Sequence, residues 1–587
     1  MCGIFGFKLK RALNEGDLKK SLEYLNLLNN RGPDNQGYYV DKENGVFLGH
    51  TRLSIIDLSQ QSNQPFKKDN SVIVYNGEVY NYKELKNDLK NINFVTNSDT
   101  EVLLSLWQKH KLNGLRKIDG MFAFAIYENK EIYIGTDYFG EKPIYYLNDD
   151  KGFYFSSEPK VLVKFLNLNV SLSQNEFEEF LALGFIMSPR TGFQKLKVLE
   201  QNSLIKIDQN NKIERSKIFL INEISDENKK TKLTPQDYVD FKDIFLRSLK
   251  RRLISDAPVG LLLSSGLDST LVASAMVREL NFKPITFTTS FRDGVDEAPQ
   301  VKRLAKYLGL QNIEISSSSD NTWKKMDEKI IDLYDVLNDN VSGIYTKQIC
   351  DVAKKYIKVG ITGIGGDELF YGYNNYDFVN KYNFLYSNSK LIKKILNKLN
   401  KFVKIKKLKE FNNLIFSDNY YNYIASKNRQ IGKLIYSKIL SLDHHPKILE
   451  NNISKYIRKF DLEHALFSSY LTSADRGSMS RSLELRTPFL SIELLNFSNK
   501  FHYKIFENNK KLFIKELLKE YLPDKYISKK KIGFNFPLKR FLKNKKINFR
   551  NNLPNDFINE LNNNIEEKYF DKIAFRLLMI EKFEKSR

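Results

Sequence analysis

The sequence predicts an α/β protein of at least two domains, with a doubly wound parallel sheet in its second half. In that half, short apolar runs typical of buried strands alternate with segments of helical periodicity, which is the order of βαβ units. Two of these runs end in glycine-containing turns. The length of 587 residues also exceeds that of one ordinary domain.

The composition is that of a globular protein with an excess of positive charge. Hydrophobic residues make up 42% of the chain and charged residues 28%, and the formal net charge is +23. The basic residues are spread along the chain, so we expect an acidic or phosphorylated ligand rather than a nucleic-acid partner. The sequence has no run of about 18 apolar residues, so no membrane span is predicted.

The chain has two cysteines, Cys2 and Cys350, too few for a disulfide framework or a structural zinc site. The first residues lack the charged region and the longer apolar region of a secretion signal. Both observations predict a protein of the reducing cytoplasm. A monomer and a homodimer both stay open.

The first candidate for chemistry is Cys2, which directly follows the initiator methionine. Removal of that methionine leaves a thiol and a free α-amine on one residue. The thiolate would be the nucleophile, and the amine, with a pKa of roughly 8, could carry its proton. The alternative is a buried cysteine at a chain end, which the position alone favours.

Polar residues follow on predicted strands and at a helix start. An alternating, strand-like stretch carries Arg52, which suits a carboxylate. Two strands are predicted on either side of a turn at Asn76 and Gly77, whose side-chain amide and N–H could form an oxyanion hole. Asp99 lies in a capped helix start. Taken singly, they are more simply a surface charge, a hairpin turn and an N-cap.

In this order, the residues belong to motifs that closely resemble the class II glutamine amidotransferase domain. The motifs are Cys-Gly-Ile at 2–4, Arg-Gly-Pro-Asp at 31–34, Arg-Leu-Ser-Ile-Ile-Asp at 52–57, Tyr-Asn-Gly-Glu at 75–78, Ser-Asp-Thr-Glu at 98–101, Gly-Met-Phe-Ala-Phe-Ala at 120–125 and Asp-Tyr-Phe-Gly-Glu-Lys-Pro at 137–143. The resemblance implies an αββα sandwich of two antiparallel sheets, the Ntn-hydrolase type of fold.

The same resemblance implies the roles of individual residues. Cys2 would attack the side-chain amide of glutamine, form a thioester and release ammonia, while Asn76 and Gly77 stabilise the oxyanion. The residues that would bind glutamine are Arg52, the backbone near Ile56, Asn76, Gly77, Glu78 and Asp99. The six histidines include no triad candidate, which fits a nucleophile that uses its own amine.

The first domain is predicted to end in the alternating strands of 196–218. A polar and charged segment follows, and it is the best linker candidate. The predicted division is therefore an amidotransferase domain at 1–221, a linker at 222–235 and a second domain at 236–587.

The second domain is predicted to begin with a helix from Gln236 and to continue with a strand at 259–263. The turn Ser-Ser-Gly-Leu-Asp-Ser at 264–269 then leads into a helix. Its backbone N–H groups and the helix N-terminus would face an anion, Gly266 would let the backbone approach, and Asp268 could hold a metal bound to the phosphates. An ordinary βα turn is the alternative.

Further strands are predicted at 284–291 and 358–362, with a helix at 297–308. A second turn, Gly-Ile-Gly-Gly-Asp-Glu at 363–368, follows the last strand, and its Asp367 could share a metal with Asp268. The two turns together predict a site for a nucleotide and a metal. As the resemblance given next implies, the ATP and pyrophosphate residues would be Leu263, Ser264, Ser265, Gly266, Leu267, Asp268, Ser269, Ser290, Thr362 and Gly363.

The pair of turns resembles the ATP-pyrophosphatase-type synthetase domain of the glutamine-hydrolysing asparagine synthetases. Further matching motifs are Asp-Arg-Gly-Ser-Met-Ser at 475–480, Ser-Leu-Glu-Leu-Arg-Thr-Pro-Phe-Leu at 482–490, Lys-Lys-Leu at 510–512 and Lys-Ile-Gly-Phe-Asn-Phe-Pro-Leu at 531–538. The resemblance implies that ATP and Mg²⁺ activate aspartate as the β-aspartyl-adenylate, and that ammonia from glutamine then forms asparagine, AMP and pyrophosphate. It also implies a functional lysine at Lys531. The segment 375–460 matches no motif and predicts a helical insertion.

One departure from the family pattern bears on the acceptor. The better-known asparagine synthetases carry an acid where this chain has Ile364, and an isoleucine cannot move a proton. Relatives with an apolar residue there resemble enzymes of surface-polysaccharide synthesis, so amidation of another carboxylate, such as a sugar uronate, is the alternative activity. A non-catalytic binding protein is the alternative of another class. The intact set Cys2, Arg52, Asn76, Asp99, Asp268 and Asp367 argues against it.

Overall fold

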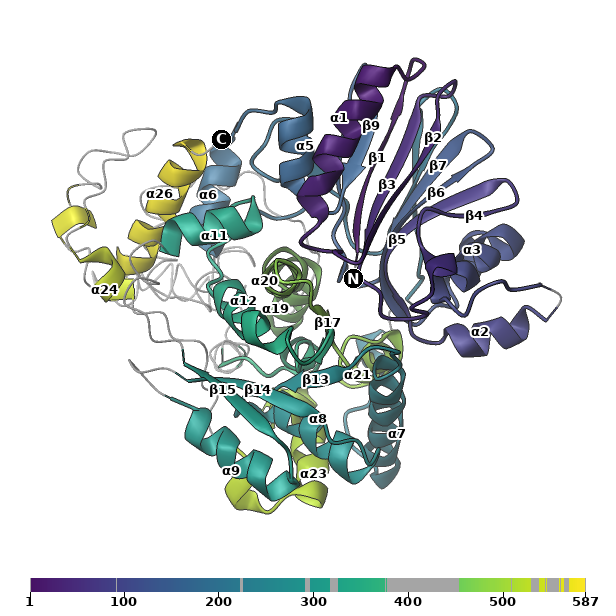
Figure 1. Cartoon of the computed structure of the whole chain (residues 1–587). Helices are drawn as coiled ribbons and strands as arrows, with labels where there is room; N and C mark the ends of the chain where they lie inside the picture. The colour runs from purple at the N-terminus through teal and green to yellow at the C-terminus, as the bar shows by residue number, and fades with distance from the viewer. Residues whose placement is uncertain are drawn as a thin grey trace.

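The computed structural model shows a β-sandwich followed by a parallel-sheet domain (Figure 1). It describes residues 2–585 except 91, 222–224, 291–295, 317–325, 375, 377–452, 508, 529–537, 544, 546–558, 560 and 564–569. Most of the predicted insertion at 375–460 therefore lies outside the described residues. The linker predicted at 222–235 also falls partly outside them, so the domain limits stay a prediction.

Two six-stranded antiparallel sheets form the sandwich. Their strand orders are β10-β8-β9-β1-β3-β2 and β12-β11-β7-β6-β5-β4. The strands are β1 (Gly3–Leu9), β2 (Asn35–Asp41), β3 (Val46–Arg52), β4 (Phe66–Lys68), β5 (Ser71–Val79), β6 (Gly120–Glu128), β7 (Glu131–Thr136), β8 (Tyr145–Asn148), β9 (Gly152–Ser156), β10 (Lys197–Val198), β11 (Ser203–Ile207) and β12 (Ile213–Lys217). Side chains at alternate strand positions, among them Ile4, Leu48 and Val74, fill the space between the sheets.

Helices cover the outer faces of both sheets. α1 (Glu15–Leu25) and α5 (Pro159–Leu166) lie against the first sheet, and α2 (Tyr82–Asp88) and α3 (Asp99–His110) lie on the side of the second (Figure 1). The short α4 (Leu112–Leu115) and α6 (Gln174–Leu183) complete the domain. The αββα sandwich is therefore confirmed, as are the strands predicted at its end.

The hairpin turn predicted at Asn76 and Gly77 is wrong. β5 continues through both residues and pairs with β6 along its whole length, with Gly77 opposite Phe122. A Cβ atom on Gly77 would lie 2.1 Å from the carbonyl oxygen of Met121. Glycine is needed at position 77 because β6 approaches closely, and not because the chain turns there. The Asn-Gly pair is therefore misleading as a turn signal in this strand.

The second domain contains a five-stranded parallel sheet of order β15-β14-β13-β16-β17, which confirms the predicted fold class. Its strands are β13 (Val259–Leu262), β14 (Ile285–Ser290), β15 (Asn312–Ser316), β16 (Val359–Ile361) and β17 (Glu484–Arg486). The helix predicted at 297–308 is α9 (Ala298–Leu308), which buries Val301, Leu304 and Leu308 along one face.

Helices lie on both faces of this sheet (Figure 1). On one side are α7 (Pro235–Arg252), α8 (Leu267–Arg278), α9 and α23 (Leu512–Tyr521), and on the other are α12 (Ser342–Ala353) and α20 (Thr472–Met479). The remaining described helices are α11 (Met326–Tyr334), α13 (Gly366–Leu369), α19 (Ile453–Phe460), the π-helix Asp461–Leu471, α21 (Ile492–Asn499), α22 (Lys504–Glu507), α24 (Leu538–Leu542) and α26 (Phe570–Lys585).

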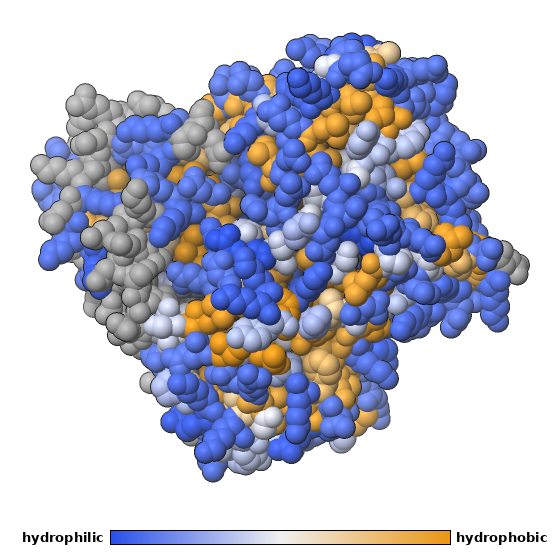
Figure 2. Space-filling view, in the orientation of Figure 1, coloured by the Kyte–Doolittle hydropathy of each residue, from blue (hydrophilic) through white to orange (hydrophobic). Residues whose placement is uncertain are grey.

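Hydrophilic side chains cover much of the face in Figure 2, while hydrophobic residues gather in the lower middle, over the parallel-sheet domain. None of the described helices is both long and apolar enough to cross a membrane.

Candidate active sites

The first candidate site lies where β1 begins. The backbone N–H of Cys2 donates to Oδ1 of Asn76 in β5 over 2.9 Å, and both residues are buried. In the part of the chain that the structure describes, the Nδ2 donor of Asn76 has no hydrogen-bond partner. A buried donor beside a thiol is suited to hold a negative charge that develops there. The structure thus brings together the predicted nucleophile and the predicted oxyanion donor.

The surroundings of the thiol act on its ionisation in both directions. Burial raises the pKa of the Cys2 thiol, whereas the positive amino terminus and a hydrogen bond from the Leu53 N–H oppose that rise. Since the thiolate is the reactive form, a base beside the thiol would be needed to remove its proton. The α-amine that removal of Met1 would create is in position for this task.

Two predicted glutamine ligands, Glu78 and Asp99, are buried acids near this thiol. Asp99 accepts hydrogen bonds from the Val79 N–H at 2.8 Å and from the Tyr75 hydroxyl at 3.1 Å. Burial raises the pKa of Asp99 to about 6. Burial and the negative charge of Glu484 raise the pKa of Glu78 well above its ordinary value. Acids in this condition would gain most from a ligand that brings a positive charge.

Arg52, the third charged residue predicted to bind glutamine, orders the loop after β3. Its guanidinium donates to the carbonyl oxygens of Ser59 at 2.8 Å, Ile56 at 3.5 Å and Asp57, and to Oδ1 of Asn63 at 2.7 Å. The backbone near Ile56 is thereby tied to the predicted carboxylate ligand. The roles of these residues toward glutamine stay predictions.

The second candidate site is a cavity of about 890 Å³ at the C-terminal ends of the parallel strands, the usual ligand position in such sheets. The predicted ATP and metal residues that line it are Leu263, Ser264, Gly266, Leu267, Asp268, Ser269, Thr362, Gly363 and Asp367. The two glycine-containing turns therefore face one cavity, as their sequences predicted.

Two predicted ATP residues, Ser265 and Ser290, are not in the cavity wall. The backbone N–H and hydroxyl of Ser265 both donate to Oε2 of Glu297, at 2.9 and 2.6 Å, so this side chain anchors the loop to the start of α9. Ser290 ends β14, and its neighbour Thr289 lines the cavity instead. The sequence alone did not show whether Thr289 or Ser290 faces the cavity, because adjacent residues of a strand point to opposite faces of the sheet.

The loop that lines the cavity is tied internally. The hydroxyls of Ser264 and Ser269 are 2.8 Å apart, and the Gly266 N–H donates to the Ser264 hydroxyl at 3.2 Å. The second turn packs directly on this loop, since a Cβ atom on Gly366 would lie 2.5 Å from Oδ1 of Asp268. Glycine at this position lets the two acids approach each other.

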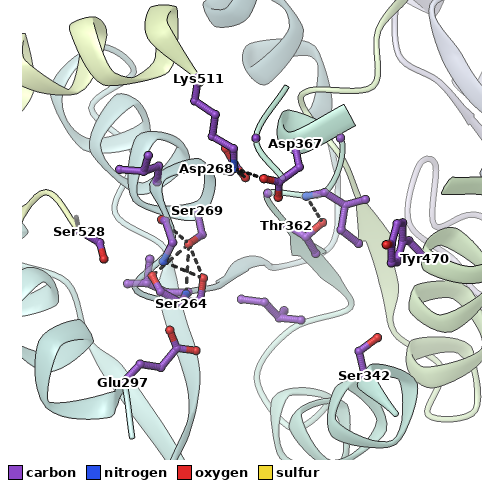
Figure 3. Close-up of a pocket in the computed structure, with 18 of the residues that line it drawn as sticks. Ser264, Asp268, Ser269, Glu297, Ser342, Thr362, Asp367, Tyr470, Lys511 and Ser528 are labelled. Carbon is purple, nitrogen blue, oxygen red and sulfur yellow. Dashed lines mark hydrogen bonds and ion pairs between the residues drawn. The ribbon is translucent and has the colours of Figure 1, made fainter. Parts of the chain in front are cut away.

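The two acids share one cation. Nζ of Lys511 lies 2.5 Å from Oδ2 of Asp268 and 2.7 Å from Oδ1 of Asp367 (Figure 3). Although burial opposes the charge of the lysine, the two carboxylates raise its pKa. The sequence motif around Lys511 was visible, and both Lys510 and Lys511 line the cavity, but nothing in the sequence shows which of the two pairs with the acids.

The donor chemistry of the pair fits a magnesium ion. Mg²⁺ prefers carboxylate oxygens and usually takes one or two of them together with substrate phosphates. Within the described residues, no group of three or more His, Cys, Asp or Glu side chains gathers around a common point. Asp268 and Asp367 could therefore hold the ion only with further ligands, such as phosphate oxygens.

Two residues that bear on the choice of acceptor, Ile364 and Glu368, line the cavity. Ile364 lines the cavity, so the position where the family often has an acid faces the ligand space. Glu368 also lines it; burial and the nearby Asp367 raise its pKa to about 7, and it accepts a hydrogen bond from Tyr373. Lys531 lies outside the described residues, so its predicted role stays a prediction.

The sites belong to one molecule with a buried contact between its domains. Nε of Arg31 donates to the carbonyl oxygen of Cys2 at 3.0 Å, and its Nη atoms pair with the Asp475 carboxylate on α20 at 2.8 and 2.9 Å. The next residue along, Ala474, lines the cavity. Arg31 therefore links the backbone of the nucleophile candidate to α20, the helix whose Ala474 lines the second site.

Comparison with known proteins finds two protein families along this chain. The glutamine amidotransferase domain family matches residues 1–218, and the asparagine synthase family matches residues 240–586. Glutamine-hydrolysing asparagine synthetase 1 of Bacillus subtilis is 29% identical over 93% of this chain and 88% of its own length. A protein of Methanocaldococcus jannaschii whose name refers to the same enzyme is 32% identical over 83% of this chain and its full length. A solved glutamine PRPP amidotransferase of Bacillus subtilis aligns with a TM-score of 0.29 at 15% identity, over 54% of this chain and 66% of its own, which carries no argument.

Proposed function

We propose that this chain, which belongs to the glutamine-hydrolysing asparagine synthetase family, makes asparagine from aspartate with glutamine as nitrogen donor and ATP as activating substrate. The observation that carries the proposal is the pairing of two sites in one chain. Cys2 lies beside Asn76 in the sandwich, and Asp268 lies beside Asp367 in the cavity of the second domain.

In the first half of the proposed reaction, the Cys2 thiolate attacks the side-chain carbonyl of glutamine. The α-amine takes the thiol proton and passes it to the departing ammonia. The Nδ2 donor of Asn76 and the Gly77 N–H stabilise the oxyanion, while Glu78 and Asp99 hold the ammonium group of glutamine. Water then hydrolyses the thioester to glutamate.

In the second half, the β-carboxylate of aspartate attacks the α-phosphorus of ATP, and pyrophosphate leaves. The backbone N–H groups at the start of α8, in the loop 264–269, hold the phosphates, and Lys511 compensates their charge. Asp268 and Asp367 would hold magnesium, which would supply charge neutralisation at the phosphates. Ammonia attacks the acyl-adenylate and AMP leaves.

A second candidate acceptor is a different carboxylate, such as a sugar uronate. The observation that favours it is the apolar side chain of Ile364 in the cavity wall, together with the hydroxyls of Ser342, Thr346 and Tyr470. Hydroxyls of this kind suit a polyhydroxylated ligand at least as well as a charged amino acid. The chemistry of activation and amide formation is the same for both acceptors.

Exchange of labelled pyrophosphate into ATP tests the acceptor directly, because exchange needs the carboxylate to be activated but does not need ammonia. We expect exchange with aspartate and none with glutamate as the control. If aspartate supports no exchange at any concentration while a uronate does, the asparagine proposal is wrong and the second candidate replaces it.

A further inference from the structure

The edge strand β17 has two sides that meet different sites. Leu485, its middle residue, lines the nucleotide cavity. Its neighbours Glu484 and Arg486 are completely buried and face the amidotransferase domain, as alternation along a strand requires. Nη2 of Arg486 lies 3.3 Å from Oε1 of Glu78, and its guanidinium lies 5.4 Å from the ring centre of Tyr80.

Other contacts of Arg486 come from its own domain and fix its direction. Its Nε donates to Oε1 of Glu484 at 2.6 Å, and Nη1 donates to the carbonyl oxygens of Arg252 at 2.9 Å and Ile254 at 2.6 Å. A planar guanidinium held at three points has little freedom to turn. The atom that remains, Nη2, is the one that meets Glu78.

This arrangement places two carboxylates, Glu78 and Glu484, around one guanidinium. The other titratable groups that act on Glu78 are Asp99, Tyr75, Tyr82 and the amino terminus. Glu484 is nearer to Arg486, and although burial opposes it, the amino terminus and Arg486 lower its pKa. Burial and the charge of Glu484 instead raise the pKa of Glu78. The two acids therefore compete for the same cation.

We propose that Arg486, a residue of the second domain, is a positioning residue of the glutamine site: it holds the Glu78 carboxylate in place and favours its charged form for the ammonium group of glutamine. Glu484 limits this effect, because it draws the same guanidinium toward itself. The inference rests on the proposed function, in which Glu78 binds glutamine.

The test compares two variants that should move one property in opposite directions. Arg486→Met removes the cation, so the KM for glutamine should rise by at least about tenfold, and the acid limb of kcat/KM for glutamine should move to higher pH. Glu484→Gln removes the competing charge, so the acid limb should move to lower pH. Synthesis from added ammonia should stay within about twofold in both.

Arg251→Met is the matched control. It breaks ion pairs of Arg251 with Glu84 and Asp119 across the same domain contact, at 2.7 and 3.0 Å, without touching either site. It should leave the KM for glutamine and the pH profile unchanged. Arg486→Lys keeps the charge and should restore part of the affinity, which a role in packing alone would not require.

Shifts of both variants in the same direction, or an unchanged profile in Glu484→Gln, would overturn the inference. If Arg486→Met does not fold, the direction of the Glu484→Gln shift decides alone, since glutamine has almost the same shape as glutamate. The proposed function fails in a different way: the unaltered protein would then show no glutaminase activity, and no electrophilic glutamine analogue would label Cys2.

Discussion

The glutamine site and the nucleotide cavity treat their acidic side chains in opposite ways. Asp99 and Glu78 are buried with raised pKa values, and among the residues that the structure describes one guanidinium, already shared with Glu484, reaches Glu78. Asp268 and Asp367 instead share the ammonium of Lys511. The first pair awaits a positively charged substrate, whereas the second already has the charge balance that a metal ion would otherwise supply.

The difference reflects the charge that each ligand brings to its site. Glutamine brings its own ammonium group, so Glu78 and Asp99 do not need a full positive counter-charge before glutamine binds. Nucleotide phosphates are anions, so the acids that face them need a cation beforehand. Because the two sites differ in this way, single substitutions should change the activity of one site and leave that of the other.

The largest separation is expected from Cys2→Ala. Glutaminase activity should fall by about 10³-fold or more, because the nucleophile is lost, while synthesis from added ammonia should stay within about twofold. Parallel assays of glutamate and pyrophosphate release measure both. Cys350→Ala is the control, since Cys350 is buried in the second domain and is not one of the residues that line the cavity, and it should leave glutaminase activity in place. Glutamine-dependent synthesis that survives in Cys2→Ala would contradict the assignment.

The converse separation is expected from Asp268→Asn and Asp367→Asn. Each amide keeps the shape but cannot neutralise a cation, so pyrophosphate release should fall by about 10²-fold or more. Glutamine hydrolysis should persist, since both residues lie in the second domain. Asp240→Asn, on α7, should change neither activity. Pyrophosphate release at the parental rate in either site variant would show that the cavity is not the ATP site.

Lys511→Met sharpens the comparison through stability. It leaves two largely buried carboxylates without their shared cation, which should cost about 3 kcal/mol and lower the midpoint of thermal unfolding by several degrees. Added Mg²⁺ should raise that midpoint more in the variant than in the unaltered protein, because the metal can replace the lost ammonium. Lys504→Met, on α22 and outside the cavity wall, is the control. An equal response of both proteins to Mg²⁺ would mean that Lys511 does not occupy the metal position.

The smallest effect is expected from Lys358→Met, which removes an ion pair with Asp34 across the domain contact. The two side chains are 38% and 30% exposed, so the pair should contribute no more than about 1 kcal/mol. Both activities should stay near parental values at low and high salt. A selective loss of glutamine-dependent synthesis would show that this outer pair, and not only the buried contacts, joins the sites.

The part of the design that the sequence predicted lies in contiguous motifs. The turn 264–269 and the residues around Asp367 each follow a recognisable strand. Because these strands, β13 and β16, are parallel neighbours, both turns line one cavity. Cys2 and Asn76 are 74 positions apart, yet each carries its own chemical signal. The parallel sheet and the strands predicted at 259–263, 284–291 and 358–362 followed from the same local patterns.

What the sequence did not predict depends on packing between distant elements. The Asn-Gly pair at 76 and 77 looks like a turn until β6 lies beside it. Lys511 and Arg486 are ordinary basic residues in the sequence, and only the fold brings one to Asp268 and the other to Glu78. Ser265 matches a loop motif, but its direction is set by Glu297.

The central claim, that nitrogen released at Cys2 is used at the nucleotide cavity, is tested most directly by isotope transfer. The protein is incubated with ATP, Mg²⁺, glutamine labelled with ¹⁵N in its side-chain amide, and aspartate or a panel of other carboxylates, and the products are identified by mass spectrometry. The account predicts one labelled amide product, with AMP and pyrophosphate formed in equal amounts. Labelled ammonia released without AMP or pyrophosphate for every carboxylate would contradict it.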